Sequence, residues 1–355
     1  MKELYIGLMS GTSFDGVDVA LCEIDSLTCK LLASLEFPFP QALKTQLLHV
    51  ITSSTSLEEI GSLDNRLAHL FSQAINALLK QENCNPKGIK AIGLHGQTLW
   101  HQPTGKTPFS IQLGDANIVH AQTEIQVVAD FRRADMAQGG EGAPFAPAFH
   151  QFHFANKERV AVLNIGGMAN ITILGDNLIG YDTGTGNVLM DYWIEKNRQK
   201  PFDKDGAWAQ SGKINEMLLS QMLQEPYFSK PYPKSTGREL FNQDWLEKQL
   251  KNFSLKAQDI QATLLTLSVH TITNELKNFD IKTLIVCGGG GENSFFMDSL
   301  QEAIHPIKLE INQEGDMLEA MAFAWLAYKR VHREKVALKS VTGAKKDTLL
   351  GGVYG

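Results

Sequence analysis

Two glycine-rich turns carry residue types that can hold phosphate. Residues 10–16 read Ser-Gly-Thr-Ser-Phe-Asp-Gly, and Gly166-Gly167 follow a second apolar run. Glycine lets the backbone approach a ligand closely and turn its amides toward phosphate oxygens. Thr12 and Ser13 add hydroxyl donors. Each turn could also be an ordinary tight hairpin, but two such turns facing one another could hold a polyphosphate.

Three aspartates could contribute acid–base or metal chemistry. Asp182 lies in a small polar loop between Gly180 and Asn187, where a carboxylate can act as a general base. It could instead cap a turn, as aspartate often does. Asp15 and Asp18 are candidates for contact with Mg²⁺, directly or through water, because nucleotide-bound Mg²⁺ takes only one or two carboxylates. Both could also be polar residues of a turn and a strand edge.

A third glycine run, Gly288 to Gly291, follows an apolar strand pattern and precedes a predicted helix. A strand, glycines and a helix N-terminus in this order suit a nucleotide or phosphate. Asn293 stands where the dinucleotide-binding fingerprint has its third glycine, which disfavours a nicotinamide site. A tight strand-to-helix turn is the alternative.

Histidine and arginine supply candidate contacts to a substrate. His95 ends a predicted strand, and strand ends are where α/β proteins place ligands. It could also be a structural histidine. Arg132 and Arg133 lie in residues 130–147, a predicted long irregular loop, and such loops tend to carry function. The pair could hold a carboxylate bidentately or be merely exposed.

The elements that position these residues alternate between strand and helix patterns, which indicates an α/β protein. Each glycine turn lies between two strand-like runs, so we predict a duplicated architecture; two unrelated hairpins are the alternative. Strands are predicted at residues 5–9, 17–24, 89–94, 125–129, 160–165, 169–174 and 283–287. Helices are predicted at residues 57–80, 188–197, 214–224, 239–251, 260–279, 293–304 and 316–330, and a polar loop at 97–106.

Composition limits the classes of function. The 355 residues are 43% hydrophobic and 20% charged, which is typical of globular proteins and long enough for two domains. The 33 Lys and Arg against 39 Asp and Glu argue against a nucleic-acid partner. Four cysteines without a paired spacing predict neither disulfides nor a zinc site. Short apolar runs predict no signal peptide or membrane span, hence a soluble, cytoplasmic protein.

Seven segments carry the motifs of a known family in chain order: residues 7–18, 94–98, 130–135, 164–170, 182–187, 288–293 and 318–324. They include Gly-Leu-Met-Ser-Gly-Thr-Ser-Phe-Asp-Gly-Val-Asp near the start, Asn-Ile-Gly-Gly-Met-Ala-Asn in the middle and Asp-Thr-Gly-Thr-Gly-Asn soon after. Together they closely resemble the anhydro-N-acetylmuramic acid kinases over essentially the whole chain.

The resemblance implies an α/β fold with two similar lobes of the actin-like ATPase (ribonuclease H-like) type and ATP in an interlobe cleft. Residues 1–128 plus about 331–355 would form the N-terminal lobe with the first phosphate loop. Residues 129–330 would form the C-terminal lobe with the second phosphate loop, the catalytic Asp182 and the adenosine motif at Gly288; the alternative is that the final helix packs on the N-terminal lobe.

The resemblance also implies an enzyme that phosphorylates 1,6-anhydro-N-acetylmuramic acid from peptidoglycan turnover, using ATP and Mg²⁺. Water opens the anhydro ring as O6 takes the γ-phosphoryl group, giving N-acetylmuramic acid 6-phosphate and ADP. O6 is locked in an acetal and carries no proton, so a base must activate water to attack the anomeric carbon. By motif position, Asp182 is that base.

The remaining site residues follow from the same motifs. Those implied to bind the nucleotide are Gly11, Thr12, Ser13, Asp15, Gly16, Asp18, Gly166, Gly167, Asn170, Gly288, Gly289, Gly290 and Asn293. Those implied to bind the sugar are His95, Gln97, Arg132 and Glu319. The family also suggests a homodimer. A kinase for another anhydrosugar, such as 1,6-anhydroglucose, is the nearest rival, and a nucleotide-binding module like actin or an Hsp70 nucleotide domain is a rival from another class.

Overall fold

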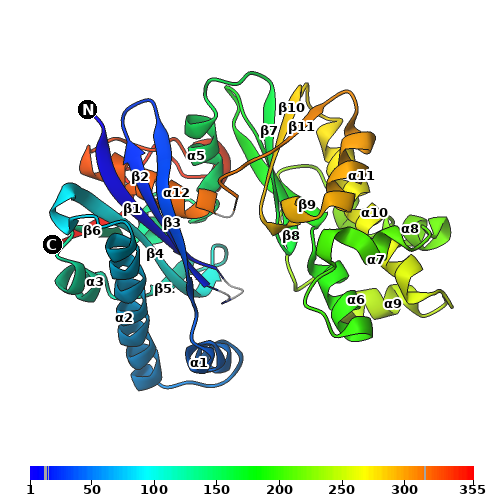
Figure 1. The fold of residues 1–355 in the computed structure, drawn as a ribbon, viewed down its shortest axis with the longest axis horizontal. Helices are drawn as coiled ribbons and strands as arrows, with labels where there is room; N and C mark the ends of the chain where they lie inside the picture. The colour runs from blue at the N-terminus through cyan, green and yellow to red at the C-terminus, as the bar shows by residue number, and fades with distance from the viewer. Residues whose placement is uncertain (12–13, 15, 316) are drawn as a thin grey trace. The chain divides into compact units, whose positions relative to one another are not determined.

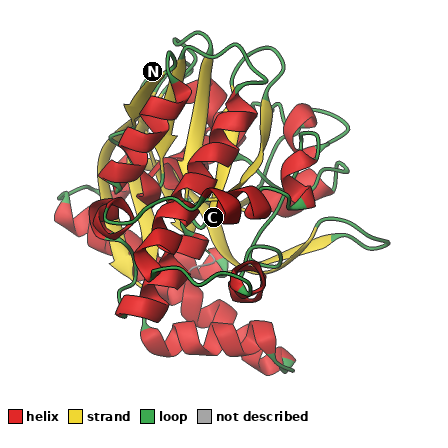
Figure 2. Ribbon diagram, turned by 90° about the vertical axis from the view of Figure 1, so that its right-hand side faces the viewer, coloured by secondary structure: helices red, strands yellow, loops and turns green. Residues whose placement is uncertain are grey.

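The computed structural model describes residues 1–355 except 12, 13, 15 and 316. The chain forms two compact units, each with its own sheet (Figure 1). Unit 1 comprises Met1–Phe154 and Met317–Gly355, and unit 2 comprises Ala155–Asp316. Helices and strands occur in both, coloured red and yellow in Figure 2. The expectation of an α/β fold is confirmed.

A seven-stranded sheet forms the centre of unit 1. Its strands run in the order β12-β6-β4-β1-β2-β3, and β5 pairs with β4. Their bounds are β1 Glu3–Ser10, β2 Gly16–Ile24, β3 Cys29–Pro38, β4 Ile89–Gln102, β5 Phe109–Leu113, β6 Val127–Ala129 and β12 Gly352–Tyr354.

The helices of unit 1 pack on this sheet around an apolar core. The longest, α2, begins with a capping box of Ser56 and Glu59 and buries Leu63, Leu67 and Phe71 on one face. The helix bounds are α1 Gln41–Thr52, α2 Leu57–Gln81, α3 Ala116–Thr123, α4 Phe131–Met136, α5 Ala146–His153, α12 Met317–Val331 and α13 Lys339–Thr342, with the 3₁₀ turn η1 Pro86–Gly88.

A five-stranded sheet forms the centre of unit 2, in the order β11-β10-β7-β8-β9. Its strands are β7 Val160–Ile165, β8 Met168–Ile173, β9 Ile179–Thr185, β10 Thr283–Cys287 and β11 Lys308–Ile311. The helices are α6 Val188–Arg198, α7 Ala207–Gln210, α8 Glu216–Met222, α9 Gln243–Leu250, α10 Ala257–Leu276 and α11 Ser294–Ile304. The 3₁₀ turns are η2 Lys204–Gly206, η3 Pro226–Ser229 and η4 Gly289–Glu292.

The two sheets repeat one topology, which confirms the predicted duplication. The order β6-β4-β1-β2-β3 in unit 1 corresponds to β11-β10-β7-β8-β9 in unit 2. In each, three consecutive strands pair antiparallel. A fourth strand, β4 or β10, then pairs parallel to the first of them, and a fifth, β6 or β11, pairs parallel to the fourth. Each glycine turn therefore connects the first two strands of one repeat.

Helix α12 packs against β1 and β4 at two glycines. A Cβ at Gly7 would lie 1.8 Å from the carbonyl oxygen of Ala320, and one at Gly93 would lie 1.9 Å from that of Phe323. Helix backbone and strand backbone therefore touch directly. This packing assigns α12 to unit 1, whereas residues 129–330 were expected in the other lobe. Residues 129–154 also belong to unit 1 by their contacts.

Gly93→Ala is therefore expected to destabilise unit 1. The new methyl group meets a helix backbone that can move only as a whole, so we expect a loss of about 1–3 kcal/mol in the free energy of unfolding. Chemical denaturation measures it. Gly88→Ala is the matched control, because nothing lies within 4 Å of a Cβ there. Equal midpoints for the two variants would contradict the close packing at Gly93.

Two segments expected to be loops are partly regular. Residues 130–147 contain α4 and the start of α5, and residues 97–102 of the expected polar loop continue β4 because β5 pairs with them. Sequence periodicity missed both because their partners lie in other segments of the chain. Among the described residues, no helix has the length and apolar character that crossing a bilayer requires.

Candidate active site

Asp182 lies in β9 and is held through both its backbone and its side chain. Its backbone N–H donates to the Lys234 carbonyl at 3.0 Å, and its carbonyl accepts from the Tyr227 hydroxyl at 2.6 Å. Its Oδ2 accepts from the Ser235 hydroxyl and the Thr236 N–H, each at 3.0 Å. No hydrogen bond to Oδ1 is recorded within the described part of the chain. One carboxylate oxygen is thus fixed, and the other is available to a substrate.

The electrostatic surroundings of Asp182 make it a stronger base than an ordinary aspartate. Burial raises its pKa, and the negative charge of Glu239 raises it further. The hydrogen bonds from Thr236 and Ser235 act in the opposite direction, and the net pKa is above the usual range. A general base works best when its pKa approaches the working pH, so this shift suits proton abstraction.

The second glycine turn adjoins Asp182 within unit 2. Gly166 and Gly167 connect β7 to β8, and Asn170 of β8 pairs with Asp182 of β9 in the sheet register. The carbonyl of Gly166 accepts from the N–H of Asn187 at 2.8 Å, which ties the turn to the start of α6. The structure therefore places the predicted phosphate turn, Asn170 and the predicted base on three adjoining segments.

The third glycine run borders a cavity of about 350 Å³ in unit 2. Gly288 has φ +81°, and a Cβ there would lie 2.3 Å from Oδ1 of Asn164, so only glycine lets the run follow β7 closely. The residues of interest around the cavity are Gly289, Gly290, Asn293, Asn187, Asp191 and Phe202. Three predicted nucleotide residues thus share a cavity with the start of α6, while Gly288 shapes the turn beside it.

In unit 1, Gln97 organises the approach to the first glycine turn. Its buried side chain accepts from the Ser10 hydroxyl at 2.6 Å and donates to the Gly11 carbonyl at 3.3 Å. Gly16 and Asp18 begin β2 on the far side of the turn. Gln97 was predicted to bind sugar; in the structure its side chain bonds to Ser10 and Gly11 at the turn. The remaining predicted turn residues, Thr12, Ser13 and Asp15, lie outside the described residues.

His95, Arg132 and Glu319 come together in unit 1. The Arg132 Nε–H donates to His95 Nε2 at 3.1 Å, and Phe323 packs 4.7 Å from the His95 ring. Burial and the Arg132 charge lower the pKa of His95 to about 3, so the ring is neutral and carries its proton on Nδ1. Burial also lowers the pKa of Arg132, and the Glu319 carboxylate opposes that shift.

Comparison with known proteins decides the family. A family model described as anhydro-N-acetylmuramic acid kinase matches residues 3–355. The protein of that description from Sulfurovum sp. (strain NBC37-1) is 55% identical, with 99% of each chain covered. The one from Vibrio cholerae is 49% identical over 99% of this chain and 98% of its own. The chain belongs to the anhydro-N-acetylmuramic acid kinase family.

The fold of this family member is shared more widely. The solved structure of (R)-2-hydroxyglutaryl-CoA dehydratase component A from Acidaminococcus fermentans superposes with a TM-score of 0.50. It covers 93% of this chain and 99% of its own, at 11% sequence identity, so the likeness concerns the fold alone. Membership of a sugar-kinase family supports the expected use of ATP.

Mg²⁺ was predicted at Asp15 and Asp18. Asp15 lies outside the described residues, and Asp18 fits that role. Asp18 is a partly buried carboxylate at the start of β2, beside the first glycine turn. Among the described residues, no three His, Cys, Asp or Glu side chains form a metal cluster. Nucleotide-bound Mg²⁺ needs no such cluster, because phosphates and water supply most of its ligands.

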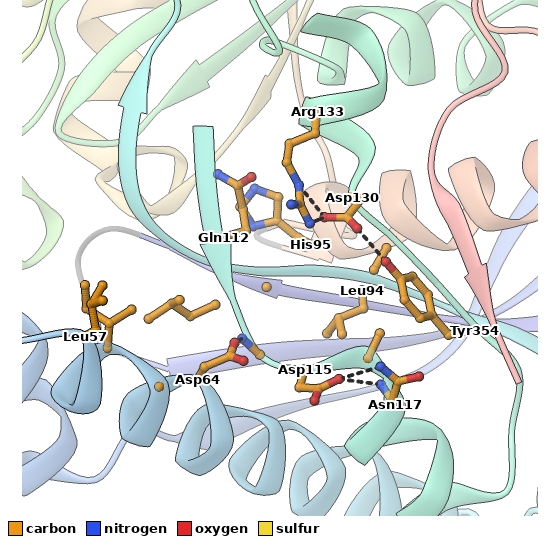
Figure 3. A pocket seen from close by; sticks show the side chains of 17 residues that line it. Leu57, Asp64, Leu94, His95, Gln112, Asp115, Asn117, Asp130, Arg133 and Tyr354 are labelled. Carbon is orange, nitrogen blue, oxygen red and sulfur yellow. Dashed lines mark hydrogen bonds and ion pairs between the residues drawn. The ribbon is translucent and has the colours of Figure 1, made fainter. Parts of the chain in front are cut away.

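A second cavity, of about 450 Å³, adjoins His95 in unit 1 of this kinase (Figure 3). Arg133 and Asp130 lie next to one another at its edge, with the Arg133 Nε–H donating to Asp130 Oδ1 at 2.8 Å and Tyr354 donating to Oδ2 at 2.5 Å. Arg132 and Arg133 were given two interpretations, a pair that holds a carboxylate or an exposed basic pair. In the structure the Arg133 guanidinium pairs with Asp130, and the Arg132 Nε–H donates to His95.

Sequence reasoning missed the segment that holds Asp182. Residues 234–238 read Lys-Ser-Thr-Gly-Arg, and Lys234 is buried against Glu275 at 2.6 Å. Ser, Thr and Gly beside basic residues were a recognisable signal of an anion-binding turn. It was overlooked because 52 residues of sequence separate Lys234 from Asp182.

Proposed function

We propose that this kinase uses Asp182 as the base that opens 1,6-anhydro-N-acetylmuramic acid while ATP phosphorylates O6. The products are N-acetylmuramic acid 6-phosphate and ADP, which places the enzyme in the recovery of sugar from peptidoglycan. The observation that carries the proposal is the hydrogen bonding of Asp182. Two donors fix Oδ2, and Oδ1 is left for a water molecule.

The reaction balances without a proton on O6. Asp182 takes a proton from water, whose oxygen forms a bond to the anomeric carbon. The bond between that carbon and O6 breaks, and its electron pair stays on O6. O6 then bonds to the γ-phosphorus, and the bond from that phosphorus to the bridging oxygen breaks with its electrons leaving on ADP. One proton per turnover is released through Asp182.

The glycine turns and the unit 2 cavity supply the proposed nucleotide site. Backbone amides of the turns at Gly11 and Gly166 would meet phosphate oxygens, and Gly289 and Asn293 would border the adenosine. Mg²⁺, with Asp18 as a carboxylate contact, would neutralise charge on the phosphates when bound. These groups act chiefly by electrostatic stabilisation of the transferring phosphoryl group.

The sugar is held, in this proposal, by the His95, Arg132 and Glu319 group. A guanidinium pairs well with a carboxylate, so Arg132 is assigned to the lactyl carboxylate of the substrate. The neutral His95 offers its Nδ1–H, which is buried and lacks a hydrogen-bond partner among the described residues. Glu319 is assigned to a sugar hydroxyl or the attacking water.

The deciding experiment is ADP release by the purified chain with MgATP and 1,6-anhydro-N-acetylmuramic acid, with the product mass determined. We expect sugar-dependent release and a product that has gained one phosphoryl group and one water. A stronger response to 1,6-anhydroglucose would reassign the substrate. ADP release that ignores every anhydrosugar would favour a nucleotide-binding module without sugar chemistry.

The pH dependence of kcat should report the raised pKa of Asp182. The base must be ionised, so the rate falls as the pH falls through the pKa of Asp182 in the folded protein. We expect this acid limb at a higher pH than an ordinary aspartate would give, because burial raises the pKa of Asp182. Glu239→Gln removes a charge that raises this pKa, so the limb should move to lower pH. Glu216→Gln, at an exposed position of unit 2, should leave it in place.

Arg132→Ala should raise the KM for the sugar by about 10-fold or more, because it removes a charged contact to the lactyl carboxylate. Arg133→Ala is the matched control, since its guanidinium is paired with Asp130. Initial-rate kinetics at saturating ATP measure both. An unchanged KM in Arg132→Ala would remove that residue from the sugar site.

We also propose a cytoplasmic homodimer, as the family suggests. Sedimentation equilibrium would test the dimer, and cell fractionation would test the location. A monomer at working concentrations would contradict the first, and recovery with the envelope would contradict the second.

A further inference from the structure

Segment 235–238, which reads Ser-Thr-Gly-Arg, has polar groups beyond those that hold Asp182. The Ser235 hydroxyl and the Thr236 N–H both donate to Asp182 Oδ2. The Thr236 hydroxyl and the Arg238 guanidinium have no assigned role in the mechanism proposed above. Both belong to the segment that contacts Asp182, a base that must act together with a phosphoryl transfer.

The Thr236 hydroxyl oxygen is buried and has no hydrogen-bond partner among the described residues. Buried polar atoms are paired in the great majority of cases, and an unpaired one calls for a bound group or water. Because the backbone of the same residue already contacts Asp182, a partner for this hydroxyl would lie close to the reacting centre.

The Arg238 guanidinium lies beside the second glycine turn. A Cβ placed on Gly167 would be 3.9 Å from Arg238 Nη2. The guanidinium also interacts electrostatically with Asp191, which borders the nucleotide cavity. For the described part of the chain, no ion pair within 4 Å of this guanidinium is recorded. Lys234, at the start of the same stretch, is paired with Glu275.

The backbone of the segment is anchored at both ends, which preorganises its N–H donors. Lys234 pairs with Glu275 in the interior at 2.6 Å. At the other end, the N–H of the buried Phe241 donates to the Gly237 carbonyl at 3.1 Å, and its ring stacks 5.4 Å from Phe228. Donors that need no rearrangement stabilise developing charge most effectively.

From these observations we infer that segment 235–238 is a further phosphate-binding loop of this kinase. The Arg238 guanidinium and the Thr236 hydroxyl hold oxygens of the terminal phosphate of the nucleotide, while Ser235 and the Thr236 backbone hold the base. The inference rests on the proposed function and deepens it. One rigid segment then positions both the proton acceptor and the phosphoryl group.

The chemistry gives the guanidinium a specific role. As the bond between the γ-phosphorus and the bridging oxygen breaks, negative charge spreads over the phosphoryl oxygens and the departing ADP. A planar guanidinium can donate two parallel hydrogen bonds to such oxygens. Lysine supplies the positive charge but not the two parallel N–H donors of a guanidinium. Arg238→Lys should therefore retain only part of the activity.

Nucleotide binding tests the loop without the sugar reaction. Calorimetry with AMPPNP and with AMP is compared for the wild type, Arg238→Ala and Thr236→Val. We expect Arg238→Ala to weaken AMPPNP binding by about 10-fold or more and to leave AMP binding unchanged, because AMP has no terminal phosphate at the loop. Thr236→Val should show a smaller loss of the same kind, and Thr236→Ser, which keeps the hydroxyl, should not.

Turnover provides a second measurement. Arg238→Ala should lower kcat by about 100-fold, and added guanidinium should restore part of it. Arg198→Ala is the matched control, because that guanidinium is exposed and stacks on Trp208 at 4.8 Å. Rescue by guanidinium requires a folded site, so it distinguishes a missing contact from a damaged structure.

The outcomes separate this inference from the proposed function. Binding of AMPPNP by Arg238→Ala within about twofold of the wild type, or equal losses for AMPPNP and AMP, overturns the phosphate loop. A different pair of results is that Arg238→Ala loses affinity for AMPPNP while the wild-type chain releases no ADP with any anhydrosugar. That pair supports the phosphate loop and overturns the proposed reaction.

Discussion

Asp182→Asn is expected to abolish sugar-dependent ADP release. Asparagine is nearly the same size and its carbonyl oxygen can still accept from Ser235 and Thr236, but its amide cannot take a proton from water. We expect kcat to fall by about 10²- to 10⁴-fold, the contribution typical of a positioned general base. Initial rates with MgATP and 1,6-anhydro-N-acetylmuramic acid measure the loss.

The same variant should still bind nucleotide, since Asp182 does not border the unit 2 cavity. Calorimetry with ADP should give an affinity within about twofold of the wild type. Asp176→Asn, in the exposed turn between β8 and β9, is the matched control and should retain full activity. Substantial turnover by Asp182→Asn would assign the base to another residue, for which Glu319 is the next candidate.

Lys234→Met is expected to destabilise the protein strongly. It would leave Glu275 in the interior without its partner at 2.6 Å. Among the described residues, the Tyr181 hydroxyl at 3.0 Å is then the hydrogen-bond donor that remains to it. Breaking a buried ion pair in this way costs about 3–5 kcal/mol. The pair anchors the segment that holds Asp182, so kcat should also fall in the variant that remains folded. Denaturant unfolding and initial rates measure the two effects.

Two further variants test the cause of that loss. Lys196→Met breaks the Lys196–Glu247 pair, which is exposed on both sides, and should cost no more than about 1 kcal/mol. Adding Glu275→Gln to Lys234→Met removes the unpaired charge and should recover part of the stability. The amide oxygen that replaces the carboxylate can still accept the hydrogen bond from the Tyr181 hydroxyl. A double variant no more stable than Lys234→Met would show that packing, not charge, is responsible.

The sequence was sufficient for the features that depend on neighbouring residues. Glycine between two apolar runs requires a turn, so both glycine turns and the duplicated hairpins were predictable. The long helix α2 was predictable as well, because its apolar residues recur at helical spacing. Seven ordered motifs were sufficient for the family, since chance does not place so many in one order.

Tertiary structure decided the features that depend on contacts across the chain. The Gln97 side chain accepts from the Ser10 hydroxyl, 87 residues away, and Ser235 of segment 235–238 donates to Asp182, 53 residues away. The strand β4 continues past Gln97 only because β5 pairs with it, and α12 joins unit 1 because two glycines admit its backbone. Hydrogen bonds and close packing between distant segments leave no periodic trace in the sequence. They therefore determine which polar residues hold the site together and which remain for a ligand.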